Sequence, residues 1–198
     1  MISKQQLAHL AEEAINLGAT ASTIISSNEV QSKDTLAALC NDEYRCPNFG
    51  LAAGCPPYVE GPSQFRKWQT QSKYSITIKI ELPLSVLYSD ERKEVMQFLH
   101  QIVAAVEQKA VEMGFKDSKG FAGGSCKELF CEDQDKCCVL AENKTCPHKA
   151  IARPSISGFG VDAVQLMKSS GWPAPIAEKS RLSDNDATSW VAGLIMLA

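Results

Sequence analysis

Helical periodicity is the clearest pattern along this chain, and it occurs three times. Apolar residues recur every three to four positions over Ser3–Leu17, as on a helix face that packs against a core. The same spacing predicts a long helix over Ser89–Met113, with Ser89 or Asp90 as its N-cap. A shorter helix is predicted over Val161–Ser170. A glycine follows each of the three segments, which is a common helix stop.

Other segments have the pattern of strands. In Lys73–Leu82, polar and apolar residues alternate with Ile76, Ile78 and Ile80 on one face, which predicts a half-buried strand. Further strands are predicted at Thr20–Ser27, Ser118–Gly124 and Thr188–Leu197.

Strands and helices alternate imperfectly, with long insertions between them. We therefore predict a single α+β domain over residues 1–198, with one mixed or antiparallel sheet and helices on one face. Residues Asp34–Cys40 can form a helical turn, and Cys46–Pro62 is rich in proline and glycine, so it reads as a structured loop. This loop and a later one are long and cysteine-rich, and we expect both to bind metal.

Charge and hydropathy exclude several classes of protein. The 198 residues carry 20 Lys and Arg against 23 Asp and Glu, a net charge of −3. A nucleic-acid-binding protein would show an excess of basic residues, so we expect no nucleic-acid partner. The sequence has no signal-peptide pattern and no apolar run of the ~20 residues that span a bilayer. We therefore expect no membrane association and a cytoplasmic location.

The eight cysteines are concentrated in two places. Cys40, Cys46 and Cys55 lie within 16 residues, the next 70 residues contain no cysteine, and five more lie between Cys126 and Cys146. In a reducing compartment, such clusters in polar segments are typical of metal or catalytic sites rather than of disulfides.

Spacing and neighbouring residues favour an iron–sulfur cluster over zinc. Zinc knuckles hold ligands about two to four residues apart, whereas these cysteines are more widely spaced and form no C-x2-C pair. Cys46, Cys55 and Cys146 each precede a proline, as does the last cysteine of a bacterial ferredoxin run. Gly124, close before Cys126, lets backbone approach a bulky inorganic core. Zinc, and redox thiols or disulfides, are the alternatives.

The candidate ligands divide by spacing. We call Cys40, Cys46 and Cys55 the first cysteine group. The second cysteine group consists of four residues that can ligate a [4Fe–4S] cluster fully: Cys126, Cys131, Cys137 and Cys146. Neighbouring side chains diverge, so Cys138 is either a small buried residue or the fourth ligand of the first group.

Weaker candidates surround these ligands. Gly124 is expected to contact the cofactor. Arg153 either offsets cluster charge or caps local carbonyls. His148 is a ligand, a proton donor or simply a hydrogen-bonding residue, and His9 and His100 show no partner pattern.

Two long segments carry a family resemblance: CPNFGLAAGCPPYVEGPSQFRKW, and GGSCKELFCEDQDKCCVLAENKTCPHKAIARPSISGFGVDAVQLMKSSGW. They resemble the predicted metal-binding protein family built on domain of unknown function 2284, whose members pair C…CP-x-[YF]-G…CPP with GGSC…C…C…C-x-x-P-x-x-ARPS. The matching positions are Cys46, Gly50, Cys55, Pro56, Pro57, Gly124, Cys126, Cys131, Cys137, Cys146, Ala152, Arg153, Pro154 and Ser155.

The chain departs from this pattern in the proline directly after Cys146 and in the additional Cys138. The resemblance covers about residues 40–172. It implies a metal-binding cysteine framework and no particular reaction.

Three functions follow from these expectations. The first is a [4Fe–4S] protein that exchanges electrons with a redox partner protein. The second is an enzyme whose three-cysteine cluster keeps one iron open as a Lewis acid. The third is a zinc-stapled structural or interaction module. In each case we expect the two cysteine groups to meet in space, with metal supplying free energy that orders their loops.

Overall fold

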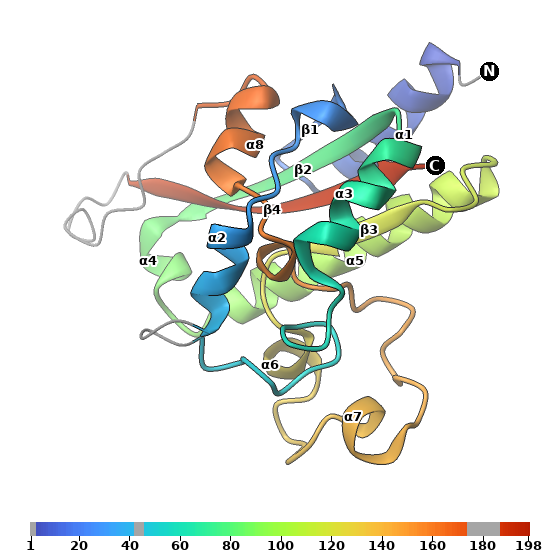
Figure 1. Cartoon of the computed structure of the whole chain (residues 1–198). Coiled ribbons are helices and arrows are strands. Elements are labelled where there is room, and N and C mark those ends of the chain that lie inside the picture. The colour runs from blue at the N-terminus through green and yellow to red at the C-terminus, as the bar shows by residue number, and fades with distance from the viewer. Residues whose placement is uncertain (1–2, 42–45, 174–186) are drawn as a thin grey trace.

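A four-stranded antiparallel sheet forms the centre of the protein (Figure 1). The structure is a computed structural model that describes residues 3–41, 46–173 and 187–198. The strands lie in the order β1-β2-β4-β3 and comprise β1 (Ala21–Ser26), β2 (Tyr74–Pro83), β3 (Lys119–Ala122) and β4 (Thr188–Leu197). The predicted α+β class with one antiparallel sheet is confirmed.

The helices connect these strands and extend beyond them. The described α-helices are α1 (Lys4–Asn16), α2 (Asp34–Ala38), α3 (Gly61–Gln71), α4 (Leu84–Leu87), α5 (Arg92–Glu112), α6 (Cys126–Phe130), α7 (Cys138–Glu142) and α8 (Ala163–Ser169). Short 3-10 turns are η1 (Ser27–Glu29), η2 (Leu39–Asn41) and η3 (Ile156–Phe159). Within the described ranges, no helix has both the length and the apolar character needed to cross a membrane.

One face of the sheet packs against α1 and α5. Ile76 of β2 pairs with Ile195 of β4, and both side chains are fully buried in this core. Each buried side chain of this size contributes about 1.5–3 kcal/mol. The helices add the apolar residues that their periodicity predicted, among them Leu7, Leu10, Leu99, Val103 and Val106.

The opposite face is covered too, so the prediction of helices on one face is wrong. Phe65 of α3, Phe121 of β3 and Phe159 of η3 form an aromatic cluster with ring centroids 5.0–6.0 Å apart. Leu166 and Met167 of α8 belong to the same core. β4 serves both cores because it is apolar on both sides, and this double-sided pattern requires a cover on each face.

The covered second face also corrects the expectation that β2 is half-buried. Ser75 and Thr77 are fully buried on it, although their polarity suggested exposure. Each hydroxyl has a partner: Ser75 Oγ lies 2.8 Å from Ser27 Oγ, and Thr77 Oγ1 lies 2.7 Å from Ser170 Oγ. These bonds remove the cost of burying an unpaired hydroxyl.

One helix start differs from the prediction, and helix α3 was not predicted at all. Helix α5 begins at Arg92, and neither Ser89 nor Asp90 caps it: Glu91 is the N-cap and makes no side-chain capping bond. Ser89 Oγ instead accepts the Glu91 N–H at 3.2 Å in the turn before the helix. Helix α3 starts at Gly61, whose φ of +70° suits glycine.

Candidate metal centre

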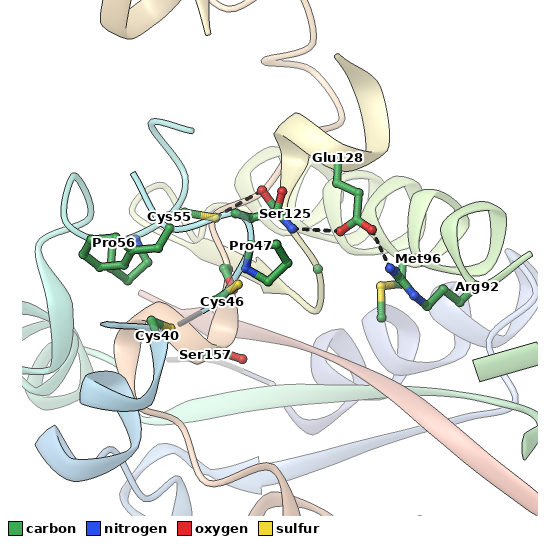
Figure 2. A pocket seen from close by; sticks show the side chains of 14 residues that line it. Cys40, Cys46, Pro47, Cys55, Pro56, Arg92, Met96, Ser125, Glu128 and Ser157 are labelled. Atoms are coloured by element: carbon green, nitrogen blue, oxygen red, sulfur yellow. Dashed lines mark hydrogen bonds and ion pairs between the residues drawn. The ribbon is translucent and has the colours of Figure 1, made fainter. Parts of the chain in front are cut away.

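The first cysteine group lines one cavity (Figure 2), together with Gly124 and Ser125, which follow β3. Cys40 lies in η2, while Cys46 and Cys55 belong to the proline-rich loop that follows. The Cys46 N–H donates to the Cys40 carbonyl at 3.2 Å, which holds the start of the loop against η2. The cavity has a volume of about 270 Å³. This is many times the ~30 Å³ share of one water molecule.

Burial raises the pKa of two of these thiols. The pKa of Cys40 is raised by burial and by the neighbouring Cys46 thiol. The pKa of Cys55 is also raised, first by burial, although a hydrogen bond to Ser125 opposes the shift. Metal binding at this group must therefore displace protons, because thiolate is the ligating form.

The second cysteine group forms around α6 and α7. Cys126 begins α6, Cys131 follows its last residue, and Cys137 is the N-cap of α7. The pKa of Cys126 is raised to about 12 by burial and by several neighbouring thiols, including those of Cys146 and Cys137. The pKa of Cys131 is raised by burial and by Cys146 and Cys137. The thiols of Cys126 and Cys131 are therefore each near those of Cys137 and Cys146, and Cys126 is also near Cys55 of the first group.

Cys137 has the most favourable surroundings for a thiolate. Burial alone would raise its pKa, but the backbone N–H groups of Ala53, Leu140 and Val139 donate to the sulfur and the net shift is downward. Such N–H donors also stabilise a metal-bound thiolate. Cys138 lies near the second cysteine group, because its thiol is one of those that raise the pKa of Cys131.

The two groups meet in space, as the sequence analysis predicted. The Cys55 thiol donates to Ser125 Oγ at 3.3 Å, directly beside Cys126. The Gly54 N–H donates to the Cys126 sulfur, and a Cβ at Gly54 would lie only 3.3 Å from it. Ser155 N–H completes the junction by donating to the Gly54 carbonyl at 2.9 Å.

The donor set fits a thiolate-bound cofactor. Both groups consist of thiols, which select zinc or iron–sulfur clusters over hard cations. In the part of the chain that the structure describes, no three His, Cys, Asp or Glu side chains converge as they would around a single ion. Glycine at position 54 lets the backbone lie close to the Cys126 sulfur, because a side chain there would contact it.

Gly124 is required by its backbone and by its neighbours. Its φ of +91° is strained for other residues, and a Cβ there would lie 2.9 Å from Met96 Sδ and 3.1 Å from Leu129 Cδ1. Gly124 also lines the cavity of the first group. It therefore lets α6 approach α5 closely, beside the expected cofactor.

Arg153 is tied to the protein on several sides. Its Nε donates to a carboxylate oxygen of Glu107 on α5, and Nη1 donates to the carbonyls of Lys149 and Ala152 at 3.2 and 3.0 Å. These bonds fix the end of the second cysteine segment against α5. Whether Arg153 also offsets cofactor charge stays a prediction.

His100, which showed no partner pattern in the sequence, has two partners in the structure. It is fully buried on α5, its Nε2 lies 3.0 Å from the Gly123 carbonyl, and its Nδ1 accepts the Arg153 N–H at 3.0 Å. One imidazole thus joins the backbone before Cys126 to the backbone after Cys146. This pairing requires the neutral ring with its proton on Nε2.

Phe130 extends this contact to the other candidate histidine. Its ring meets His100 edge-on at 5.5 Å between centroids and stacks on His148 at 5.6 Å. His148 thus packs on an aromatic ring two residues after Cys146.

Acid is expected to destabilise the protein partly through His100. Burial, followed by the Arg153 charge, lowers its pKa from 6.5 to about 4. Between pH 6.5 and pH 4, His100 binds a proton in the unfolded chain but not in the folded one. The free energy of unfolding is therefore highest above pH 6.5 and falls as the pH falls toward 4. In this pH range we expect the unfolding free energy of His100→Gln to depend less steeply on pH than that of wild type, by up to about 1.4 kcal/mol per pH unit. Urea unfolding across this pH range measures the slope.

His9→Gln is the matched control for this prediction, because His9 is exposed on α1. It should retain the wild-type slope. Parallel slopes for wild type and His100→Gln would contradict the role given to the buried imidazole.

Taken together, the α+β fold and two adjoining groups of free thiols define a cysteine-based metal-binding protein. Residues 23–196 match the family described as "Predicted metal-binding protein (DUF2284)", and the chain belongs to this family. The family indicated by the two cysteine motifs is therefore confirmed. No curated protein and no solved structure matches the chain.

Proposed function

We propose that this chain is an iron–sulfur protein that passes electrons to or from a partner enzyme. The proposal is supported by the second cysteine group, because the thiols of Cys126 and Cys131 each lie near those of Cys137 and Cys146, and four thiols are enough to ligate a cluster. When bound there, a fully thiolate-ligated [4Fe–4S] cluster supplies one-electron transfer.

The surrounding residues would tune that site. The N–H groups of Ala53, Val139 and Leu140 point at the Cys137 sulfur, and the positive charge of Lys127 lies near it. Donors and cations around the sulfurs stabilise the more negative, reduced state and so raise the reduction potential.

An exposed groove beside Cys137 supports a protein partner. Leu51, Tyr58 and Leu140 line it and are 49%, 53% and 36% exposed. Apolar side chains gathered at the surface are typical of an interaction site. Glu132 of the exposed run Glu132–Asp135 pairs with Lys93 at 2.6 Å, and Asp135 lines the groove beside Lys136. We therefore propose a redox partner whose docking surface is apolar with a rim of mixed charge, in a reducing compartment such as the cytoplasm.

Metal analysis tests the proposal. Anaerobically purified protein should contain about eight iron and eight sulfide per chain if both groups hold [4Fe–4S], or about four of each if one does. Dithionite should bleach the visible absorption reversibly. Stoichiometric zinc without acid-labile sulfide would overturn the proposal and favour a zinc-stapled module.

A second candidate function rests on the cavity at the first cysteine group. Cys40, Cys46 and Cys55 line it together with polar side chains from α5 and α6. Three cysteine ligands leave a cubane corner without a thiolate, and an open position allows Lewis-acid chemistry on a bound molecule. In this reading the second group supplies electrons or structure, and the first group is the catalytic centre.

A further inference from the structure

The cavity of the first cysteine group has two chemically different walls (Figure 2). The three thiols lie on one side. Arg92, Met96 and Glu128 lie on the other, and they come from α5 and α6. A molecule in the cavity would therefore contact the metal ligands at one end and a charged pair at the other.

A hydrogen-bond network holds the charged wall in place. Arg92 Nη2 donates to Glu128 Oε1 at 2.6 Å, and Asn48 Nδ2 donates to Glu128 Oε2 at 3.0 Å. Glu128 is thus bound on both carboxylate oxygens and fixes the position of the guanidinium. Arg92 carries five N–H donors, and within the part of the chain that the structure describes its side chain uses one of them, in the pair with Glu128.

Size and charge define the class of ligand. The volume of about 270 Å³ is below the roughly 300–1,000 Å³ of pockets for drug-sized molecules, and a bound metal would take part of it. Among the described residues that line the cavity, Arg92 is the basic side chain. An arginine at the wall of a small, mostly apolar cavity pairs best with a carboxylate, through charge-assisted hydrogen bonds.

We propose that this cavity binds a small carboxylate-bearing molecule, with Arg92 holding its carboxylate and the first cysteine group presenting metal to its other end. The metal half of this proposal rests on the second candidate function above. Ser125 and Ser157 also line the cavity, so a hydroxyl on the ligand has hydroxyl partners there. A short hydroxy acid would offer a carboxylate to Arg92 and a hydroxyl to the metal or to one of these serines.

Lactate and its neutral analogue lactamide test the proposal on the reconstituted full-length protein. We expect lactate to bind by calorimetry and to change the electron paramagnetic signal of one cluster, whereas lactamide binds at least tenfold more weakly. Arg92→Gln should weaken lactate binding about tenfold to hundredfold, the scale for a hydrogen bond to a charged group. Arg92→Lys should keep part of the affinity.

Arg66→Gln is the control for loss of a positive charge, because Arg66 pairs with Asp34 on the surface. It should bind lactate like wild type. Equal binding of lactate and lactamide to wild type would overturn the role of charge without depending on any variant. Protein that contains iron and sulfide but does not bind lactate would overturn the carboxylate proposal alone. Arg92-dependent lactate binding in protein without iron would support the carboxylate site and contradict the iron–sulfur proposal.

Discussion

Cys137→Ser is expected to remove the metal of the second cysteine group, whereas Cys138→Ser leaves it in place. Cys137 receives three backbone N–H donors and affects the pKa of both Cys126 and Cys131. A serine hydroxyl is a poor substitute for a soft thiolate ligand. If both groups hold [4Fe–4S], the Cys137 variant should retain about half of the iron and sulfide of wild type. Metal analysis and the electron paramagnetic spectrum measure this directly.

Cys138→Ser is the matched control for Cys137→Ser, because both variants replace a thiol by a hydroxyl at neighbouring positions. Equal metal content in the two variants would contradict the assignment of Cys137. Loss of the first-group signal in Cys138→Ser would identify Cys138 as a fourth ligand there, and the open-position candidate function would lose its basis.

Much of the fold could be predicted because the relevant patterns are local. Helix α1 begins where Ser3 and Gln6 form a reciprocal capping box, and Leu7 and Leu10 follow at core spacing. The second covered face could not be predicted in this way. It depends on buried polar residues such as Ser75, whose partner Ser27 lies 48 residues away in sequence.

The candidate site, too, could be predicted from the sequence only in part. The cysteines stand out because they are clustered in sequence, and their loops do meet. His100 and Arg92 give no such signal. His100 lies beside Leu99 on the buried face of α5, where periodicity predicts core packing. Arg92 lies at the start of the same helix, where an arginine is expected to be solvated. Only the packing of α6 onto α5 brings them to the site.

Removing the metal is expected to unfold the two cysteine segments locally while the sheet core persists. Leu129 is the one buried residue among residues 126–154, and Ala52 and Cys55 are the buried residues among 46–62. Ordering the backbone costs roughly 1–2 kcal/mol per residue, which so few buried side chains cannot offset. Metal–thiolate bonds supply the missing free energy, because binding to a site that is not preformed becomes folding free energy.

Trypsin digestion of metal-loaded and metal-free protein measures this difference. Metal removal should speed cleavage after Lys136, Lys144 and Lys149, which lie at the surface of the second segment. Lys116 is an internal control, since it is exposed between α5 and β3, outside both cysteine segments, and should be cut at the same rate in both forms. Fragments that contain β2 and α5 should survive longest, because both elements are buried in the core under α1. Equal cleavage at the three loop lysines with and without metal would show that the scaffold orders these segments by itself, and the metal would then be an addition to a finished fold.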